Sequence, residues 1–361
     1  MSKSSDYSFI AVADIHIGHK LYNIPELEED INWVFSRIVE EAIQRKVSYL
    51  VIAGDLYDTN KPTPSMIRFV RQQVALLKSN GVTAVGIAGD HDKPLNGSSW
   101  MQLSDIVAVN TVPHFCGFDY SDNPVDVINS VIAEADKRQG IQWVFLHGQV
   151  PTLFNFTEDK KRLDLDQVDF CDLFPDIQGI ILGDIHSPVE GHLMCKDRKV
   201  YMGYCGSPAV INSSEIENKA GIFYSKNGKS LERIKIPQRR VYLKYQEEDE
   251  LPIISMIEYF SKLEHKPVLI VEFENKEKLK LLSQLQNLAF VRTMKIRHAS
   301  ENKSVENVNI RSELSTHDRI FNTLKGVLTD TYPLEIGLKL LGDEDPKTVL
   351  DQVRVKYGIT V

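Results

Sequence analysis

The chain has 361 residues, of which 42% are hydrophobic and 25% are charged, and its formal net charge is −8. This length allows more than one domain, and the composition excludes a disordered or fibrous chain. No apolar run approaches the roughly 20 residues of a membrane span, and the first residues lack the apolar core of a secretory signal, so we expect a cytoplasmic protein.

Residues 1–235 alternate short apolar runs with helix-like segments. Two segments between the first three runs carry apolar residues at helical spacing, residues 26–45 and 63–81. Each apolar run is continuous and bounded by polar residues or glycine, which is typical of a strand buried on both faces. Five runs fit this description: residues 9–16, 49–55, 84–92, 143–148 and 179–186. The alternation predicts an α/β fold.

Beyond the fifth run the pattern changes to hairpins. Residues 190–208 and 219–237 each read as two strands joined by a turn, the second with an Asn-Gly turn at Asn227 and Gly228. The change of pattern predicts a second sheet. Near residue 238 the composition shifts again, and two apolar runs around a lysine-rich segment predict a small βαβ-like unit. A polar connector from residue 301 leads to two helix candidates, residues 314–329 and 346–356.

Acidic and imidazole side chains stand where the five apolar runs end. A single such Asp most often caps a helix or makes a turn, and a single His is most often just hydrogen-bonded. Recurrence at five strand ends favours one shared site, because ligands bind beyond the carboxyl ends of strands in open α/β sheets. Converging carboxylates repel one another unless cations neutralise them. The pattern therefore predicts a metal centre with seven candidate ligands: Asp14, His16, Asp55, Asp90, His147, Asp184 and His186.

These residues form a series of motifs, D-x-H, G-D-x-x-D, G-D-H-D, H-G and G-D-x-H, that resembles the signature of calcineurin-like metallophosphoesterases. The stretches AGDLYDTNKP, LGDIHSP and YCGSP are similar to those of the Mre11/SbcD nuclease family, and the likeness covers residues 8–235. The resemblance implies a four-layer sandwich, two β-sheets flanked by helices, in a nuclease domain of residues 1–237. By order and size, residues 238–300 would form a small α+β capping domain that binds DNA. Residues 301–361 would form a linker and a helical tail that binds an ATPase.

The resemblance also implies roles for the site residues. Two divalent ions would share Asp55, one held further by Asp14, His16 and His186 and the other by Asp90, His147 and Asp184. Such a pair activates water for in-line attack on a phosphodiester. His91 would stabilise the transition state or protonate the leaving oxygen. Asp58 would orient groups behind the ions or assist the leaving group, and a simple turn acid is an equal alternative.

Two ligand positions depart from the family's usual pattern. Asp90 stands where the family usually has Asn, and Asp184 stands where it usually has His. Both changes replace a neutral ligand by a carboxylate, so we expect Mn²⁺, with Mg²⁺ as the alternative, to serve better than Zn²⁺. The competing interpretation is a chain that has lost a proper second ion site and survives as a catalytically weakened scaffold subunit.

DNA ends are the substrate that the resemblance implies, cut by exonuclease or endonuclease action in DNA repair and recombination. The acidic net charge predicts weak contact through backbone phosphates, with Lys61, Lys93, His19 and the basic run 160–162 as candidates. An apolar stripe on residues 314–329 could dock on a coiled-coil ATPase of the Rad50/SbcC kind, or pack on its own domain. The implied assembly is a homodimer, in a bacterial cell or a phage-infected host. The alternative is a stand-alone phosphodiesterase that acts on small molecules.

Overall fold

The computed structural model describes residues 7–93, 100–153, 161–165, 168–195, 198–216, 222–246, 253–273, 282 and 284–295. The chain divides into two compact units, residues 1–296 and 297–361. The second unit, with the helix candidates at 314–329 and 346–356, lies outside the described residues. Within the described ranges, no helix combines the length and the apolar character needed to cross a membrane.

The first sheet has six strands in the order β11-β10-β1-β2-β3-β4. Four of them run parallel: β1 (Phe9–Val12), β2 (Tyr49–Ala53), β3 (Thr83–Ile87) and β4 (Val107–Ala108). The antiparallel hairpin of β10 (Ile222–Ser225) and β11 (Glu232–Ile234) extends the sheet beyond β1. Gly228 in the connection has a φ of 72°, but Asn227 is not among the residues with positive φ, and residues 226–231 separate the strands, so the predicted tight Asn-Gly turn is replaced by a longer connection.

The second sheet has five strands in the order β5-β6-β7-β9-β8. The parallel strands are β5 (Phe115–Gly117), β6 (Trp143–His147), β7 (Gly179–Gly183) and β9 (Arg198–Tyr204), and β8 (Glu190–Cys195) pairs antiparallel with β9. The predicted second sheet is therefore present. Only the β8–β9 hairpin belongs to it, together with β5, β6 and β7, and the β10–β11 hairpin joins the first sheet. A continuous apolar run reveals burial on both faces but not the pairing partner.

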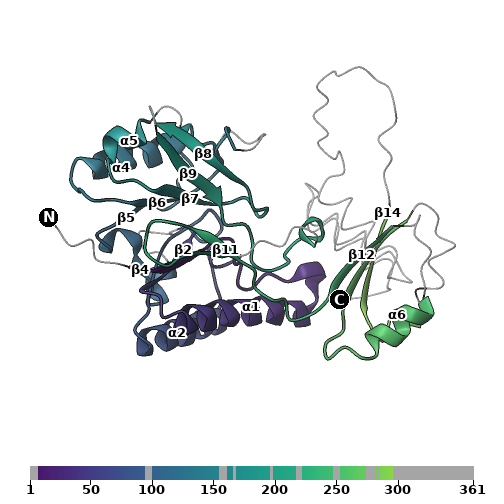
Figure 1. The fold of residues 1–361 in the computed structure, drawn as a ribbon. Coiled ribbons are helices and arrows are strands. Elements are labelled where there is room, and N and C mark those ends of the chain that lie inside the picture. Colours follow the sequence, from purple (N-terminus) through teal and green to yellow (C-terminus); the bar gives the residue numbers. More distant parts are fainter. Residues whose placement is uncertain are drawn as a thin grey trace, which may run out of the picture. The chain divides into compact units, whose positions relative to one another are not determined.

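Helices cover the outer face of each sheet (Figure 1). On the first sheet lie α1 (Pro25–Gln44) and α2 (Pro64–Ser79), and on the second lie α4 (Pro124–Ala135) and α5 (Phe170–Leu173). Pro64 opens α2 and the Thr63 side chain accepts a hydrogen bond from the Met66 N–H, which caps the helix. Short elements complete this part: α3 (Trp100–Leu103) and the 3₁₀ turns Leu21–Asn23, Val109–Thr111 and Ser213–Glu215.

The two sheets face each other across an apolar core rich in aromatic rings. The ring of Phe9 in β1 meets those of Phe115, Trp143 and Phe145 edge-on, with centroids 5.4, 5.3 and 6.2 Å away. These rings belong to one buried cluster that also contains Val51 of β2. The predicted order of helix, sheet, sheet and helix is therefore confirmed. Close packing of this core fixes the strand ends of one sheet against those of the other.

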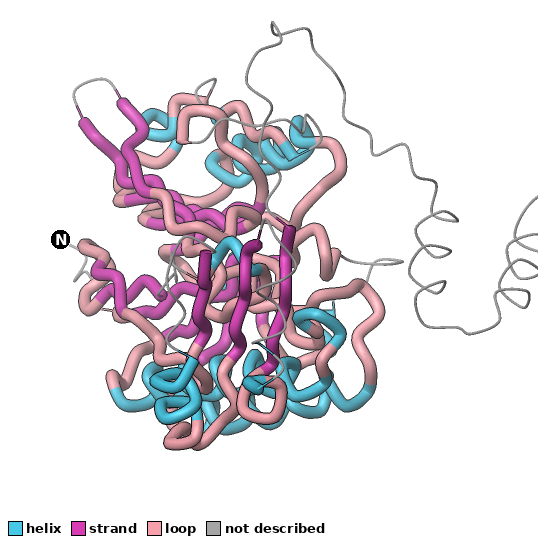
Figure 2. Tube along the Cα trace, turned by 90° about the vertical axis from the view of Figure 1, so that its right-hand side faces the viewer, coloured by secondary structure: helices cyan, strands magenta, loops and turns pink. Residues whose placement is uncertain are grey.

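A third, smaller sheet follows in the chain. Its strands β12 (Tyr242–Gln246), β13 (Val268–Phe273) and β14 (Phe290–Lys295) run parallel in that order (Figure 2), and α6 (Ile253–Phe260) connects the first two. The two predicted apolar runs are strands β13 and β14. The lysine-rich segment between them lies largely outside the described residues, and α6, which precedes β13, was not predicted. The buried guanidinium of Arg240 donates to Asp30 Oδ1 of α1 at 2.8 Å, and the Tyr242 hydroxyl donates to Asp30 Oδ2 at 3.0 Å. A buried ion pair thus ties this sheet to α1.

Candidate metal centre

The loops that follow β1, β2 and β7 adopt an unusual backbone conformation. Asp14, His16, Asp55 and Asp184 all have positive φ, at 54°, 54°, 51° and 95°. Non-glycine residues in this region cost about 1–3 kcal/mol each and persist only where the surroundings compensate. Bonds between the loops compensate here, since the His16 N–H donates to the Asp55 carbonyl at 3.0 Å and the Asp184 N–H donates to Asp14 Oδ1 at 2.9 Å. Such strain clusters at functional sites.

Glycines allow these loops to approach one another. Gly54 has a φ of 95°, and a Cβ atom there would lie 2.1 Å from His147 Nδ1. A Cβ on Gly89 would lie 2.2 Å from Asp55 Oδ1. Both contacts are far shorter than real Cβ atoms make, so larger side chains would push His147 and Asp55 out of the site. The glycine in each G-D motif is therefore a requirement of the geometry.

The first group of ligand-type atoms comes from Asp14, His16 and His186, and these atoms lie within 4.8 Å of one another. His16 donates from Nδ1 to Asp58 Oδ1 at 3.1 Å, and His186 donates from Nδ1 to Glu215 Oε1 at 2.9 Å. Each ring therefore presents Nε2 to the other, with 3.2 Å between the two nitrogens. Two imidazole lone pairs that face one point are suited to a shared cation.

The second group comes from Asp90, His147 and Asp184, again with ligand-type atoms within 4.8 Å of one another. His147 is fully buried and donates from Nδ1 to the Ala53 carbonyl at 3.0 Å. Its Nε2 therefore faces the site, 3.3 Å from Asp90 Oδ1. This hydrogen bond to the backbone is the usual way to fix the tautomer of a metal-binding histidine.

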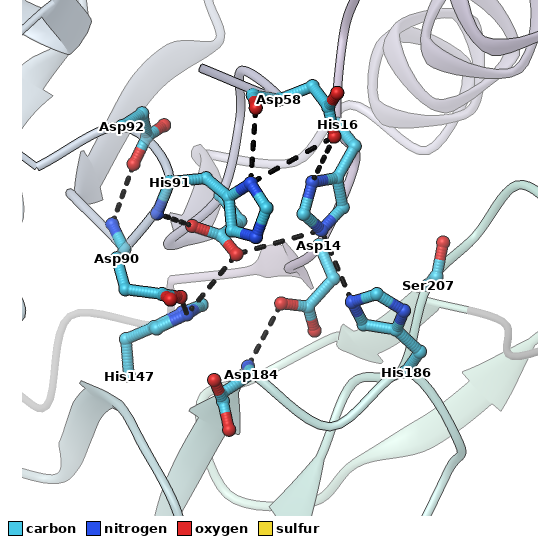
Figure 3. Close-up of polar contacts among 12 residues, drawn as sticks. Asp14, His16, Asp58, Asp90, His91, Asp92, His147, Asp184, His186 and Ser207 are labelled. Carbon is cyan, nitrogen blue, oxygen red and sulfur yellow. Dashed lines mark hydrogen bonds and ion pairs between the residues drawn. The ribbon is translucent and has the colours of Figure 1, made fainter. Parts of the chain in front are cut away.

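Figure 3 shows the three residues of each group as sticks. Asp55 lies between the two groups, as two distances show. Its Oδ2 is 3.6 Å from His16 Nε2 on one side and 3.4 Å from His147 Nε2 on the other. Its Oδ1 accepts a hydrogen bond from the His91 backbone N–H at 3.0 Å. The structure thus brings all seven predicted residues together, and Asp55, directly after β2, faces both groups.

Two observations test whether these residues fit cations: carboxylate oxygens that lack hydrogen-bond partners, and the shifted pKa values of two aspartates. Asp14 Oδ2 and Asp184 Oδ2 are buried and, among the described residues, have no hydrogen-bond partner. Buried carboxylate oxygens are costly without a partner, and a cation supplies one. Burial raises the pKa of Asp14, whereas for Asp55 the charges of His147 and His16 outweigh burial and lower its pKa. The donor set of carboxylates and imidazoles therefore fits hard or borderline divalent ions.

Lys161 joins the second group, which the sequence did not predict. Its Nζ lies 2.6 Å from Asp184 Oδ1 and 2.7 Å from Asp90 Oδ2. Burial would lower the pKa of this ammonium, but the hydrogen bonds to Asp184 and Asp90 prevail and raise it. The sequence marked Lys161 only as part of a basic run, and no local pattern points to its place between two carboxylates.

Two further acids support the site and were not predicted. Glu215 is buried behind His186, and its Oε2 accepts from the Ile211 N–H at 3.1 Å. Asp92 is fully buried and accepts three backbone N–H bonds, from Leu56 at 2.7 Å, Tyr57 at 3.2 Å and Gly89 at 2.7 Å. Burial and then the neighbouring Asp55 raise the pKa of Asp92 to about 7. The place of Asp92 in the G-D-H-D motif could have predicted its role, whereas no motif points to Glu215.

Two of the candidates for catalysis and DNA contact, His91 and His19, hydrogen-bond to a third, Asp58. His16 and His19 donate to Asp58 Oδ1 at 3.1 and 3.2 Å, and His91 donates from Nδ1 to the Asp58 carbonyl at 3.1 Å. Burial would raise the pKa of Asp58, but the bonds from His16 and His19 lower it well below its usual range. Lys61 is exposed, and Lys93 pairs with Asp122 at 2.7 Å. His91 is the most open ring of the site, with 43% of its side chain exposed.

Comparison with known proteins agrees with this geometry. Residues 7–188 match the family described as calcineurin-like phosphoesterase, and the matched stretch contains all seven candidate ligands. This match spans half of the chain, so the chain belongs to that family and is a metal-dependent phosphoesterase.

Similarity to particular proteins extends further along the chain. The DNA double-strand break repair protein Mre11 of Sulfolobus acidocaldarius is 21% identical over 96% of this chain and 98% of its own length. The protein of the same name from Thermoplasma acidophilum is 22% identical over 96% of this chain and 97% of its own. The predicted resemblance to Mre11 is therefore confirmed. A solved dimetal phosphatase from Danio rerio covers 64% of this chain and 99% of its own at 12% identity and a TM-score of 0.38, too low to add to the assignment.

Proposed function

We propose that this protein is the DNA nuclease subunit of an Mre11–Rad50-like (SbcCD-like) complex, which hydrolyses phosphodiester bonds at DNA ends with two divalent ions. The position of Asp55 carries the proposal, because one carboxylate lies within 3.6 Å of the imidazole nitrogens of both ligand groups. Relatives named as DNA double-strand break repair proteins, similar over 96% of the chain, support DNA as the substrate.

The residues would share the ions as follows. Asp14, His16 and His186 hold one ion, Asp90, His147 and Asp184 hold the other, and Asp55 contacts both. Four of these seven ligands are carboxylates, which favours Mn²⁺, or Mg²⁺, over Zn²⁺. When bound, such a pair lowers the pKa of a water molecule and offsets the charge of the phosphodiester.

The remaining polar groups of the site would act on the substrate. The bond from His91 Nδ1–H to the Asp58 carbonyl fixes that ring. In its cationic form, with both nitrogens protonated, the ring can give the Nε2 proton to the leaving oxygen. The Asp58 carboxylate holds His16 and His19 in position through their Nδ1–H groups. No serine or cysteine nucleophile is required, since water is the attacking group.

DNA would be held through its backbone. Lys61, Lys93 and His19 lie on the chain segments that follow the site's first three strands, and they are our candidates for phosphate contact. Residues 238–300 would add a capping surface for DNA, and residues 301–361 would bind a Rad50/SbcC-like coiled-coil ATPase, with the complex built on a homodimer. Phosphate contact alone gives sequence-independent binding that weakens with salt.

Hydrolysis assays test the function. We expect the purified chain with Mn²⁺ to cut linear duplex DNA or single-stranded DNA in preference to a small phosphodiester such as bis(p-nitrophenyl) phosphate, and Asp90→Ala to abolish cleavage. His192→Ala, in the exposed part of β8, is the matched control. Preference for the small phosphodiester would indicate a stand-alone enzyme, and unchanged function in Asp90→Ala would indicate a scaffold. Faster turnover with Zn²⁺ than with Mn²⁺ would contradict the metal assignment.

The tail is tested by co-purification. The full chain should retain the ATPase on an affinity column, and a chain that ends at residue 304 should release it while still cutting DNA. Retention by the shortened chain would mean that the stripe at 314–329 packs within this protein instead.

A further inference from the structure

Lys161 occupies the place where a cation is expected. Its ammonium lies 2.6 Å from Asp184 Oδ1 and 2.7 Å from Asp90 Oδ2, and both oxygens belong to the second ligand group. No other lysine or arginine among the described residues makes an ion pair with a candidate ligand. Without ions, one positive charge of the chain itself therefore holds this group together.

The backbone of Lys161 is fixed next to the site. The Gln149 N–H donates to the Lys161 carbonyl at 2.6 Å, and the Leu163 N–H donates to the Gln149 carbonyl at 2.6 Å, so this segment pairs with the residues that follow β6. A Cβ on Gly148 would lie 2.9 Å from the Lys161 carbonyl oxygen, so glycine is needed for the approach. Leu163 is buried in the core of the second sheet, which anchors the segment.

A divalent ion and this ammonium cannot use the same oxygens. Mn²⁺ or Mg²⁺ would sit at coordination distance from Asp90 and Asp184, whereas Nζ already lies within hydrogen-bond distance of one oxygen on each. Two cations that close repel strongly in a partly buried site. The first group has no such competitor, because no lysine or arginine among the described residues forms an ion pair with Asp14, His16 or His186.

We propose that Lys161 is an internal competitor for the second ion, so that the two ion sites load in order. The group of Asp14, His16 and His186 binds first, and the group of Asp90, His147 and Asp184 takes an ion only when the ammonium of Lys161 leaves its two carboxylates. This inference rests on the proposed two-ion function. The proposal also explains why carboxylates stand at positions 90 and 184, where the family usually has Asn and His. Two neutral side chains would not form ion pairs with the ammonium of Lys161.

Calorimetric titration of the ion-free full chain with Mn²⁺ tests the order of loading. Wild type should bind two ions in separate steps, and Lys161→Met should tighten the second step by about 5- to 150-fold, the usual range of coupling between sites, without changing the first. Lys78→Met, at the exposed C-terminal end of α2, is the matched control and should behave as wild type. Equal affinity for both ions in wild type, or an unchanged or weaker second step in Lys161→Met, would overturn the proposal.

A second measurement needs no variant. Acetylation of Lys161 by an amine-reactive reagent, followed by mass spectrometry, should be slow in the ion-free protein and rise only with the second equivalent of Mn²⁺, while Lys78 reacts at a constant rate. A constant rate at Lys161 would contradict displacement. Failure of the proposed function looks different, since neither wild type nor Lys161→Met would then bind Mn²⁺ at all.

Discussion

The Nδ1–H of His186 donates to Oε1 of Glu215 at 2.9 Å, which leaves His186 Nε2 facing the first ligand group. Glu215 also accepts a hydrogen bond from the Ile211 N–H, so it connects His186 to the backbone at Ile211. Carboxylates in this position orient a ligating imidazole and raise its basicity.

Glu215→Gln should therefore weaken Mn²⁺ binding at the first site about 10- to 100-fold. The amide keeps an oxygen for the Ile211 N–H, so we expect the thermal unfolding temperature of the ion-free protein to change little. Calorimetry measures the binding step, and Glu232→Gln, on the exposed strand β11, serves as the control. Unchanged Mn²⁺ affinity would mean that the hydrogen bond to His186 is not needed to orient it.

His91→Ala should lower kcat by about 100- to 10,000-fold, the range for loss of a general acid, while both Mn²⁺ binding steps remain. The reason is that His91 Nδ1 is bound to the Asp58 carbonyl and its ring is open to solvent, unlike the buried candidate ligands. Hydrolysis kinetics and calorimetry on the same sample separate the two effects. If an ion is lost along with activity, His91 is a ligand and not the proton donor.

Asp92→Ala should destabilise the ion-free protein by at least about 3 kcal/mol, because three buried N–H groups lose their acceptor at about 1–3 kcal/mol each. Asp92→Asn can keep the hydrogen bonds from the Leu56 and Tyr57 N–H groups, but its amide NH₂ would face the Gly89 N–H. It should therefore lose less stability than Asp92→Ala. Urea unfolding followed by circular dichroism gives both values. Equal stability of the two variants and wild type would show that these bonds do not hold the loops.

The stability of the ion-free protein should depend on pH through His186. Burial lowers its pKa, but the hydrogen bond to Glu215 and the charge of Asp14 prevail and raise it from 6.5 to about 9. A histidine whose pKa is higher in the folded than in the unfolded state stabilises the fold at any pH below its unfolded-state pKa. This contribution is lost as the pH rises through its folded-state pKa. In EDTA, the stability advantage of wild type over His186→Ala should therefore shrink from pH 6.5 to 9.

Mn²⁺ should reverse this trend. Ligating imidazoles must be deprotonated, so the stabilisation by bound ions grows with pH over the same range. Urea midpoints measured with and without Mn²⁺ give both slopes. The same slope in EDTA for wild type and His186→Ala would rule out His186 as the titrating group.

Much of the site could be read from local patterns. Each candidate ligand follows a continuous apolar run, and parallel strands end at a common edge, so residues as distant as Asp14 and His186 could be predicted to meet. The hairpin of β10 and β11 was equally local, and Gly228 in its connection has the positive φ that glycine tolerates. Asp92 was present in a recognised motif, but its burial under three backbone N–H groups depends on the packing of the β2 and β3 loops and not on the motif.

The sequence by itself determined where strands and helices form and which polar residues stand at strand ends, because apolar periodicity and strand-end chemistry are properties of a few neighbouring residues. Only the tertiary structure decided how those strands divide between the two sheets, that Glu215 supports His186, and that Lys161 reaches Asp90 and Asp184. Strand pairing and contacts between residues far apart in the chain depend on how the whole core packs, and no short stretch of sequence encodes that.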